Sequence, residues 1–178
     1  NPLEVARSLE AFRPLPGRLQ LIEGARRSLL IDDTYNASPT SLAAALRTLS
    51  SFGGMRKIVA LGDMLELGTE SRAAHTNIAA LVRECDADEV FLAGEHMRLA
   101  EESLVRSGFS QEKIHWFDHP ETLGRAMLPM LREGDVVLFK GSQGMRMEKA
   151  VEIAMDDPTK AESLLPRQSA AWKKIPFS

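Results

Sequence analysis

The feature that most constrains the fold is a regular alternation of short apolar runs with segments of helical periodicity. Five runs are rich in Val, Ile, Leu and Phe: SLLI at 28–31, KIVAL at 57–61, EVFLA at 89–93, KIHWF at 113–117 and DVVLF at 135–139. Runs this apolar are typical of strands covered on both faces. Between them, apolar residues recur at helical spacing, as at Leu42, Ala45, Leu46 and Leu49. The alternation predicts an α/β fold: a doubly wound, mostly parallel sheet with helices on both faces.

Composition and charge exclude several classes of protein. Hydrophobic residues make up 44% and charged residues 26% of the 178 residues, as in ordinary globular domains, so a disordered or collagen-like chain is excluded. No apolar run approaches the roughly 18 residues that a membrane-spanning helix needs, and we expect no membrane insertion. The 22 basic residues form no stripe with aromatic residues between them, which argues against a nucleic-acid partner. Cys85 is the single cysteine, so we expect a buried thiol and a cytoplasmic, reducing location.

Three segments are expected along the chain. The stretch RPLPGR at 13–18 has the prolines and glycine of a linker. Residues 1–16 are therefore interpreted as the end of a preceding domain and its linker, and the absence of an initiating Met or a signal pattern suggests a cut within a longer protein. Residues 17–156 form the predicted α/β domain, and residues 157–178 form a C-terminal tail with no recognisable pattern.

Polar residues follow the predicted strands directly. In open parallel sheets, ligands bind beyond the carboxyl ends of the strands, where loops gather and helix N-termini point their free N–H groups. The residues at these ends are Asp32-Asp33, Gly62-Asp63, Gly94-Glu95, Asp118-His119 and Lys140-Gly141-Ser142. A ligand site is therefore expected along this edge of the sheet.

The first of these ends, in LLIDDTYNASPTSL, carries the most information. Ser38 is a predicted helix N-cap and Pro39 the first helical residue, which places Asp33 and Asn36 at the mouth of a helix. A carboxylate there can accept from ribose hydroxyls, and an amide can contact an adenine edge or a phosphate oxygen. The alternative is that Asp32 and Asp33 only accept hydrogen bonds from nearby backbone N–H groups.

The last end, FKGSQGMRMEKA, places Lys140 and two glycines before a helix, an arrangement suited to holding an anion. An ion pair of purely structural role is the alternative for Lys140. No GxxxxGK[ST] sequence occurs in the chain, so the main phosphate-binding loop of an ATP site is missing.

Histidines and the loop LGDMLELG at 61–68 are less decisive. The loop alternates polar and apolar residues, so it suits either binding or packing. His75 lies beside the apolar stripe of the next predicted helix, where a solvated or capping role is the simpler interpretation. His96, His115 and His119 show no metal spacing or triad partner and are interpreted as structural, and no metal ligand is assigned.

Three motifs in register give a resemblance to a known family. DDTYNASP, LGDMLELG and KGSQGMRME, preceded by PGRLQ, resemble the C-terminal, Rossmann-like domain of Mur ligases, particularly the type that adds D-alanyl-D-alanine. The resemblance implies a ligase of peptidoglycan synthesis that joins D-alanyl-D-alanine to UDP-N-acetylmuramoyl-tripeptide. ATP would phosphorylate the tripeptide carboxylate with the help of Mg²⁺, and the incoming amine would attack the acyl phosphate.

The same resemblance implies a division of labour between domains. The phosphate-binding loop and the Mg²⁺ ligands belong to the central domain, and the C-terminal domain closes over ATP and the incoming amine. The partners of this chain are then the central and N-terminal domains of the same protein. Alone, the chain is expected to turn over no ATP.

Roles are implied for eight residues by their positions in the motifs. Arg18 matches the hinge arginine that reaches the nucleotide phosphates, Asp33 the acid near the ATP ribose, and Asn36 a residue near the nucleotide. The residues in segments on the incoming-substrate side are Asp63, Glu66, His75, Lys140 and Ser142. Ser38 replaces the usual second asparagine of the family's YNANP stretch, which preserves the helix cap but removes an amide at that place.

Two other interpretations remain open from the sequence. A folylpolyglutamate synthetase-like ligase belongs to the same superfamily, but such enzymes typically carry DGAHNP where this chain has DDTYNASP. A signalling receiver domain also has an acidic pair after its first strand and a lysine after its last. Its phosphoacceptor would follow two helices, whereas only one fits between Asp33 and Asp63.

Overall fold

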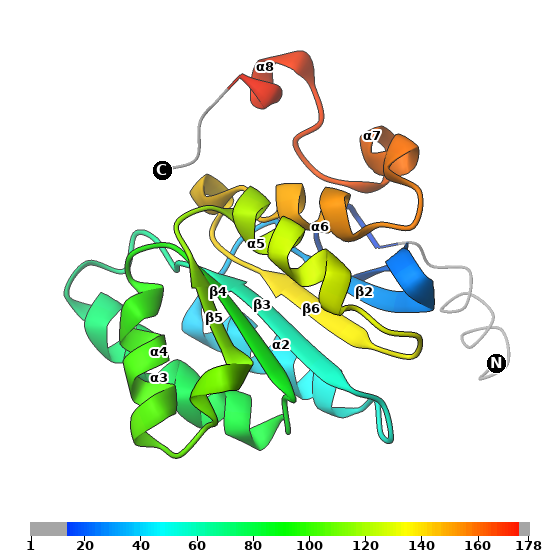
Figure 1. Cartoon of the computed structure of the whole chain (residues 1–178). Helices are drawn as coiled ribbons and strands as arrows, with labels where there is room; N and C mark the ends of the chain where they lie inside the picture. The colour runs from blue at the N-terminus through cyan, green and yellow to red at the C-terminus, as the bar shows by residue number, and fades with distance from the viewer. Residues whose placement is uncertain (1–13, 175–178) are drawn as a thin grey trace, which may run out of the picture.

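The structure, a computed structural model, describes residues 14–174 and contains one six-stranded sheet with helices on both faces (Figure 1). Of the expected preceding domain and linker, 1–16, residues 1–13 lie outside the described part, and so do the last four residues of the tail, 175–178. The strands are β1 Gln20–Gly24, β2 Ser28–Asp33, β3 Lys57–Gly62, β4 Glu89–Ala93, β5 Ile114–Phe117 and β6 Val136–Lys140. The helices are α2 Pro39–Ser50, α3 Ser71–Glu84, α4 Met97–Arg106, α5 Pro120–Met127, α6 Glu148–Ala154, α7 Ala161–Leu164 and α8 Ala170–Lys173.

The sheet has the order β1-β2-β6-β3-β4-β5, and all neighbours except β1 and β2 pair in parallel. The five apolar runs form strands β2 to β6, so the predicted fold class is confirmed. Strand β1 was not predicted. It lies at the sheet edge, pairs antiparallel with β2, and buries only Ile22 and Gly24 of its five residues. Such a half-exposed edge strand has too few apolar residues to stand out in the sequence.

Each face of the sheet carries its own helices and its own hydrophobic core. Helices α2, α3 and α4 cover one face, and α5 and α6 cover the other (Figure 1). The first core includes Leu42, Leu46 and Leu49 of α2, which confirms the helical pattern of the sequence. Cys85 is buried in this core, and burial raises the pKa of its thiol to about 11, which keeps it protonated and unreactive.

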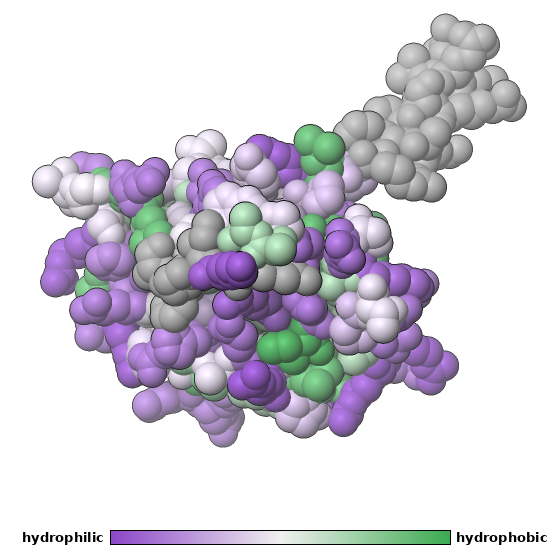
Figure 2. Space-filling view, turned by 90° about the horizontal axis from the view of Figure 1, so that it is seen from above, coloured by the Kyte–Doolittle hydropathy of each residue, from purple (hydrophilic) through white to green (hydrophobic). Residues whose placement is uncertain are grey.

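Two short helices, α7 and α8, follow α6 in the described part of the tail. Ala161 and Leu165 are buried in the core on the α5 and α6 side of the sheet. The tail therefore packs on the domain. Seen from the tail side in Figure 2, the surface is dominated by hydrophilic residues, and the hydrophobic residues form only small separate patches. Within residues 14–174, no helix is both long enough and apolar enough to cross a membrane.

Candidate functional site at the carboxyl edge of the sheet

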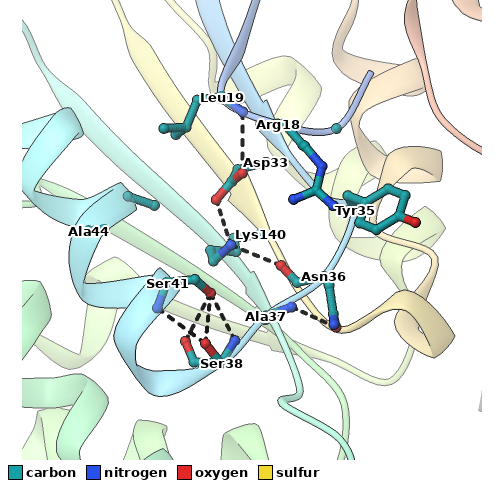
Figure 3. Close-up of a pocket in the computed structure, with 12 residues that line it drawn as sticks. Arg18, Leu19, Asp33, Tyr35, Asn36, Ala37, Ser38, Ser41, Ala44 and Lys140 are labelled. Atoms are coloured by element: carbon teal, nitrogen blue, oxygen red, sulfur yellow. Dashed lines mark hydrogen bonds and ion pairs between the residues drawn. The ribbon is translucent and has the colours of Figure 1, made fainter. Parts of the chain in front are cut away.

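A cavity of about 450 Å³ opens where strands β2 and β6 end (Figure 3). These two strands are neighbours, and Asp33 pairs in register with Lys140. Their adjacency brings together two motifs that lie more than 100 residues apart in the sequence. The lining residues are Gly17, Arg18, Leu19, Asp33, Tyr35, Asn36, Ala37, Ser38, Ser41, Ala44, Ala45 and Lys140.

A buried ion pair forms the floor of this cavity. The Lys140 Nζ atom donates to Asp33 Oδ2 at 2.5 Å and to the backbone oxygen of Asn36 at 2.9 Å. The side chains of Lys140 and Asp33 are only 3% and 15% exposed. Burial raises the pKa of the Asp33 carboxyl, and the hydrogen bond and positive charge of Lys140 oppose that rise. The pair holds the β2 loop against β6.

An exposed cation and an aromatic ring form the rim. The guanidinium carbon of Arg18 lies 4.2 Å from the centroid of the Tyr35 ring, a cation–π contact (Figure 3). The Asn36 Oδ1 atom accepts from the Ala37 N–H at 2.9 Å, and its side-chain nitrogen has no partner among the described residues. The rim therefore offers a cation, an aromatic face and an amide donor to a ligand.

The start of α2 forms one wall of the cavity. Ser38 is the N-cap, accepts from the Ser41 N–H, and forms a capping box with the Ser41 side chain, while Pro39 is the first helical residue, as predicted. The N-terminus of a helix carries partial positive charge, which favours an anionic ligand.

The buried carboxylate of Asp32 lies beneath this loop. It accepts from the N–H of Gly17 at 3.0 Å, the N–H of Thr34 at 3.2 Å and the hydroxyl of Thr34 at 2.6 Å. Burial raises the pKa of Asp32 to about 6 in spite of these three donors. Asp32 thus accepts from two backbone N–H groups, as the capping interpretation expects, and also from the Thr34 hydroxyl. Asp33 also accepts a backbone N–H, that of Leu19 at 3.2 Å, but it lines the cavity as well.

A second cavity, of about 570 Å³, lies further along the same edge, at the ends of β3, β4 and β5. Asp63 reaches it, and its carboxylate accepts from the N–H groups of His96 at 3.1 Å and Met97 at 2.9 Å at the start of α4. Burial raises the pKa of Asp63, and these donors oppose the rise. Gly94 has a φ of +109°, and a Cβ there would lie 2.5 Å from the Asp63 carboxyl carbon. This turn therefore requires glycine.

The second cavity has a stacked cation of its own. The guanidinium carbon of Arg98 lies 3.2 Å from the centroid of the Trp116 ring, and Trp116 Nε1 donates to the Gly94 backbone oxygen at 2.8 Å. The remaining lining residues are Leu65, Glu95, His96, Asp118 and His119. The sequence interpretation missed Arg98 and Trp116 and assigned His96 and His119 to structure. The signal that could have found them was their position at the ends of the third and fourth apolar runs: Arg98 follows the run at 89–93, and Trp116 lies in the run at 113–117.

Five of the eight predicted site residues line these cavities. Arg18, Asp33, Asn36 and Lys140 line the first, and Asp63 lines the second. Lys140, expected on the incoming-substrate side, thus lies beside the residues expected to contact the nucleotide.

The other three, Glu66, His75 and Ser142, line neither cavity. Glu66 is exposed, at a φ of +63°. Ser142 Oγ accepts from the Leu65 N–H at 2.8 Å. This bond holds the loop that follows β3.

His75 has a different environment from the one expected. The simpler interpretation, a solvated or capping histidine, is wrong, because its side chain is fully buried. Its Nε2 atom accepts from the Met64 N–H at 3.0 Å, so Nδ1 carries the proton and donates to the Ser71 backbone oxygen at 2.7 Å. Burial lowers the pKa of His75, and the neutral ring supports the loop after β3 from within.

The fold is that of a doubly wound α/β domain, with polar loops and two cavities at one edge of its sheet. The sequence model of the family "Mur ligase, glutamate ligase domain" matches residues 17–143, and the chain belongs to this family. The receiver-domain alternative is thereby set aside.

Two relatives of the chain are ligases of the same type. The chain is 32% identical over 158 residues to the UDP-N-acetylmuramoyl-tripeptide–D-alanyl-D-alanine ligase of Bacillus subtilis, covering 88% of this chain and 34% of that protein. For the Escherichia coli ligase of the same name the identity is 33% over 153 residues, with 85% and 32% covered. The chain therefore spans about one third of the length of these relatives.

Solved structures give the same result. MurF from Acinetobacter baumannii superposes with a TM-score of 0.69 at 30% identity, covering 82% of this chain and 32% of that one. MurF from Thermotoga maritima, solved in complex with ADP, superposes with a TM-score of 0.67 at 27% identity, covering 90% and 37%. The chain thus has the fold of one domain of these ligases.

Proposed function

We propose that this chain is the C-terminal closing domain of an ATP-dependent ligase that joins D-alanyl-D-alanine to UDP-N-acetylmuramoyl-tripeptide. The observation that carries the proposal is the first cavity, because it gathers Arg18, Asp33 and Asn36 in one place next to a helix N-terminus. Residues with these chemistries suit the phosphate, ribose and base of a nucleotide. The ADP complex of the Thermotoga relative supports a nucleotide rather than another anion.

In this proposal each residue at the first cavity has its own task. Arg18 swings from the Tyr35 ring to the nucleotide phosphates, since its guanidinium is exposed and stacks on that ring. Asp33 accepts from the ribose hydroxyls, and Lys140 keeps it ionised. Asn36 donates its free amide hydrogens to the base or a phosphate oxygen.

The second cavity and the loop after β3 form the proposed incoming-substrate side. D-Alanyl-D-alanine carries an amine and a carboxylate. The second cavity offers the carboxylates of Glu95 and Asp118 to the amine, and the guanidinium of Arg98 to the carboxylate. Glu66, His75 and Ser142 contribute through the conformation of the loop that borders this side. Closure of the domain would exclude water from the activated carboxyl group.

ATP supplies the phosphoryl group that activates the tripeptide carboxylate, and Mg²⁺ is assigned to the central domain. Within residues 14–174, no group of three or more His, Cys, Asp or Glu side chains could hold a metal ion. The proposal therefore places no Mg²⁺ ligand on the described part of the chain. The contribution of this domain is to close the site and orient both substrates.

The test is phosphate release by the full-length ligase that carries this domain, supplied with UDP-N-acetylmuramoyl-tripeptide, ATP and Mg²⁺. We expect release to require D-alanyl-D-alanine, and we expect this chain alone to release none. Asp33→Ala should lower kcat/KM for ATP, whereas Glu112→Ala, on the far end of the domain before β5, should leave it unchanged. Release without any dependence on the dipeptide would refute the substrate assignment, and a folylpolyglutamate-type ligase would then be tested with glutamate.

A further inference from the structure

The tail beyond the family match returns to the first cavity. After α6 the chain buries Ala161 and Leu165 in the core and then runs to the loop that joins β2 to α2. This loop, residues 34–36, carries Tyr35 and Asn36 of the cavity. The tail thus contacts the loop that carries two residues of the proposed nucleotide site.

Arg167 makes the contact. Its guanidinium donates to the backbone oxygens of Thr34 at 2.6 Å and Tyr35 at 3.1 Å. Both oxygens lie between the end of β2 and the start of α2, outside regular secondary structure, so the arginine supplies donors that neither element provides. The Arg167 side chain is 4% exposed and its backbone has a φ of +58°, a conformation that non-glycine residues rarely adopt. An unfavourable backbone conformation and a buried charge thus coincide at the residue that makes this contact.

The buried carboxylate of Glu148 fixes the arginine in place. Glu148 accepts from Arg167 at 2.7 Å and from Arg146 Nε at 2.6 Å, and its own side chain is 1% exposed. Arg146 in turn donates to the Trp172 backbone oxygen at 2.8 Å. The tail is therefore attached to the β6–α6 segment at two points, Arg167 and Trp172.

A third segment meets the other two at this point. A Cβ on Gly17 would lie 2.9 Å from the Tyr35 backbone nitrogen and 3.0 Å from Pro166 Cγ, so these residues are in close contact. The Tyr35 N–H donates to the Gly17 oxygen at 3.0 Å. Gly17 directly precedes Arg18, the cation at the rim of the cavity. The tail consequently touches both segments that bear the rim of the cavity.

We propose that Arg167 is a positioning residue for the nucleotide site: with Pro166 it clamps the 34–36 loop and Gly17, and so fixes Arg18, Tyr35 and Asn36 in their binding geometry. That the ligand is a nucleotide rests on the proposed function, whereas the contacts by which Arg167 holds the loop do not depend on it. The competing explanation is that Arg167 only secures the tail. Two experiments separate these explanations.

The first experiment measures amide hydrogen exchange in this chain, without any ligand. In Arg167→Ala we expect amides 34–37 to exchange about tenfold faster or more, because the loop loses two hydrogen bonds, while β3 stays protected. Arg106→Ala, an exposed arginine whose partner Glu102 lies 3.8 Å away, is the matched control and should change nothing at the loop. Unchanged exchange at 34–37 would overturn the clamp.

A lysine variant covers the case in which the alanine variant does not fold. Arg167→Lys keeps a charge for Glu148 but cannot donate to two carbonyl oxygens and a carboxylate through a planar fork. Faster exchange confined to 34–37 supports the clamp. Wild-type exchange at these amides in the lysine variant overturns it.

The second experiment uses the full-length ligase and steady-state kinetics. Arg167→Lys should raise KM for ATP about tenfold and leave kcat and KM for D-alanyl-D-alanine within about twofold, since only the nucleotide rim is misplaced. An unchanged KM for ATP, or equal rises in both KM values, would overturn the positioning role. If the wild-type enzyme shows no dipeptide dependence, the proposed function fails, whereas the exchange experiment still decides the clamp.

Discussion

Replacing Lys140 by methionine removes the cation from the floor of the first cavity and keeps most of the side-chain volume. Asp33 then stays largely buried, with the Leu19 N–H as its remaining backbone donor and Arg18 as a neighbouring charge, but it loses the cation that contacts it. Breaking a buried ion pair at one partner typically costs about 3–5 kcal/mol in free energy of unfolding, because an uncompensated charge remains. We therefore expect Lys140→Met to destabilise the chain by about 3 kcal/mol at pH 7.

The partner variant and the double variant complete a thermodynamic cycle. Asp33→Asn keeps an acceptor for Lys140, which also donates to the Asn36 oxygen, so its cost should be smaller, about 1–3 kcal/mol. The double variant removes both charges and should be much less destabilised than the sum of the two single variants. The expected coupling energy is about 2 kcal/mol or more.

The assay is urea unfolding of this chain at pH 7, and a second ion pair serves as control. Lys149 and Glu121 also lie 2.5 Å apart, but their side chains are 29% and 30% exposed. Solvent screening should reduce their coupling to about 0.2–1 kcal/mol. Equal coupling energies for the two pairs, or additive effects at Asp33 and Lys140, would refute the argument from burial.

Three further predictions concern the second half of the sheet edge and the helix cap. Gly94→Ala should lower the free energy of unfolding by at least about 2 kcal/mol in urea titrations, since the new Cβ meets Asp63 at a positive φ. Ser38→Ala should cost about 1 kcal/mol in the same assay through loss of the N-cap, and no loss would contradict the capping box. Burial lowers the pKa of His75 below its ordinary value of 6.5, so the unfolded chain binds more protons at this residue than the folded chain does. The contribution of the neutral ring to the free energy of unfolding is therefore complete above pH 6.5 and is lost as the pH falls through the pKa of the folded state. His75→Gln should flatten this part of the stability profile between pH 7 and 5, and an identical slope in the variant would exclude His75 as its source.

The fold was predictable because its main signal is local. Buried parallel strands must be apolar throughout, and the runs that became β2 to β6 show this directly. Strand β1 is different, since it is held by antiparallel pairing at an edge and turns into β2 through Arg26 and Arg27 at positive φ, without an Asn-Gly signal. β1 forms because it pairs with β2, and the sequence pattern of residues 20–24 alone does not reveal this pairing.

The candidate site was predictable only where its residues follow strand ends. Asp33 and Lys140 each follow an apolar run, and the parallel register of β2 and β6 brings them together. The Arg98–Trp116 stack depends on the adjacency of β4 and β5, and His75 is buried by loop packing. Arg167 reaches the site from 132 and 133 residues away in sequence, through backbone oxygens that no side-chain pattern reveals. Contacts between a side chain and the backbone of a distant segment are the features of the site that could be found only from the structure.

Photo-crosslinking tests the central claim, that the first cavity is the nucleotide side of the ligase, most directly. The full-length enzyme is irradiated with 8-azido-ATP and Mg²⁺, digested with trypsin, and analysed by mass spectrometry. The tryptic peptide 28–47 carries Asp33, Tyr35 and Asn36, with Arg27 before it and Arg47 at its end. We predict that this peptide is labelled and that excess ATP prevents the labelling. Label found elsewhere in the protein, with none on peptide 28–47, would contradict the account.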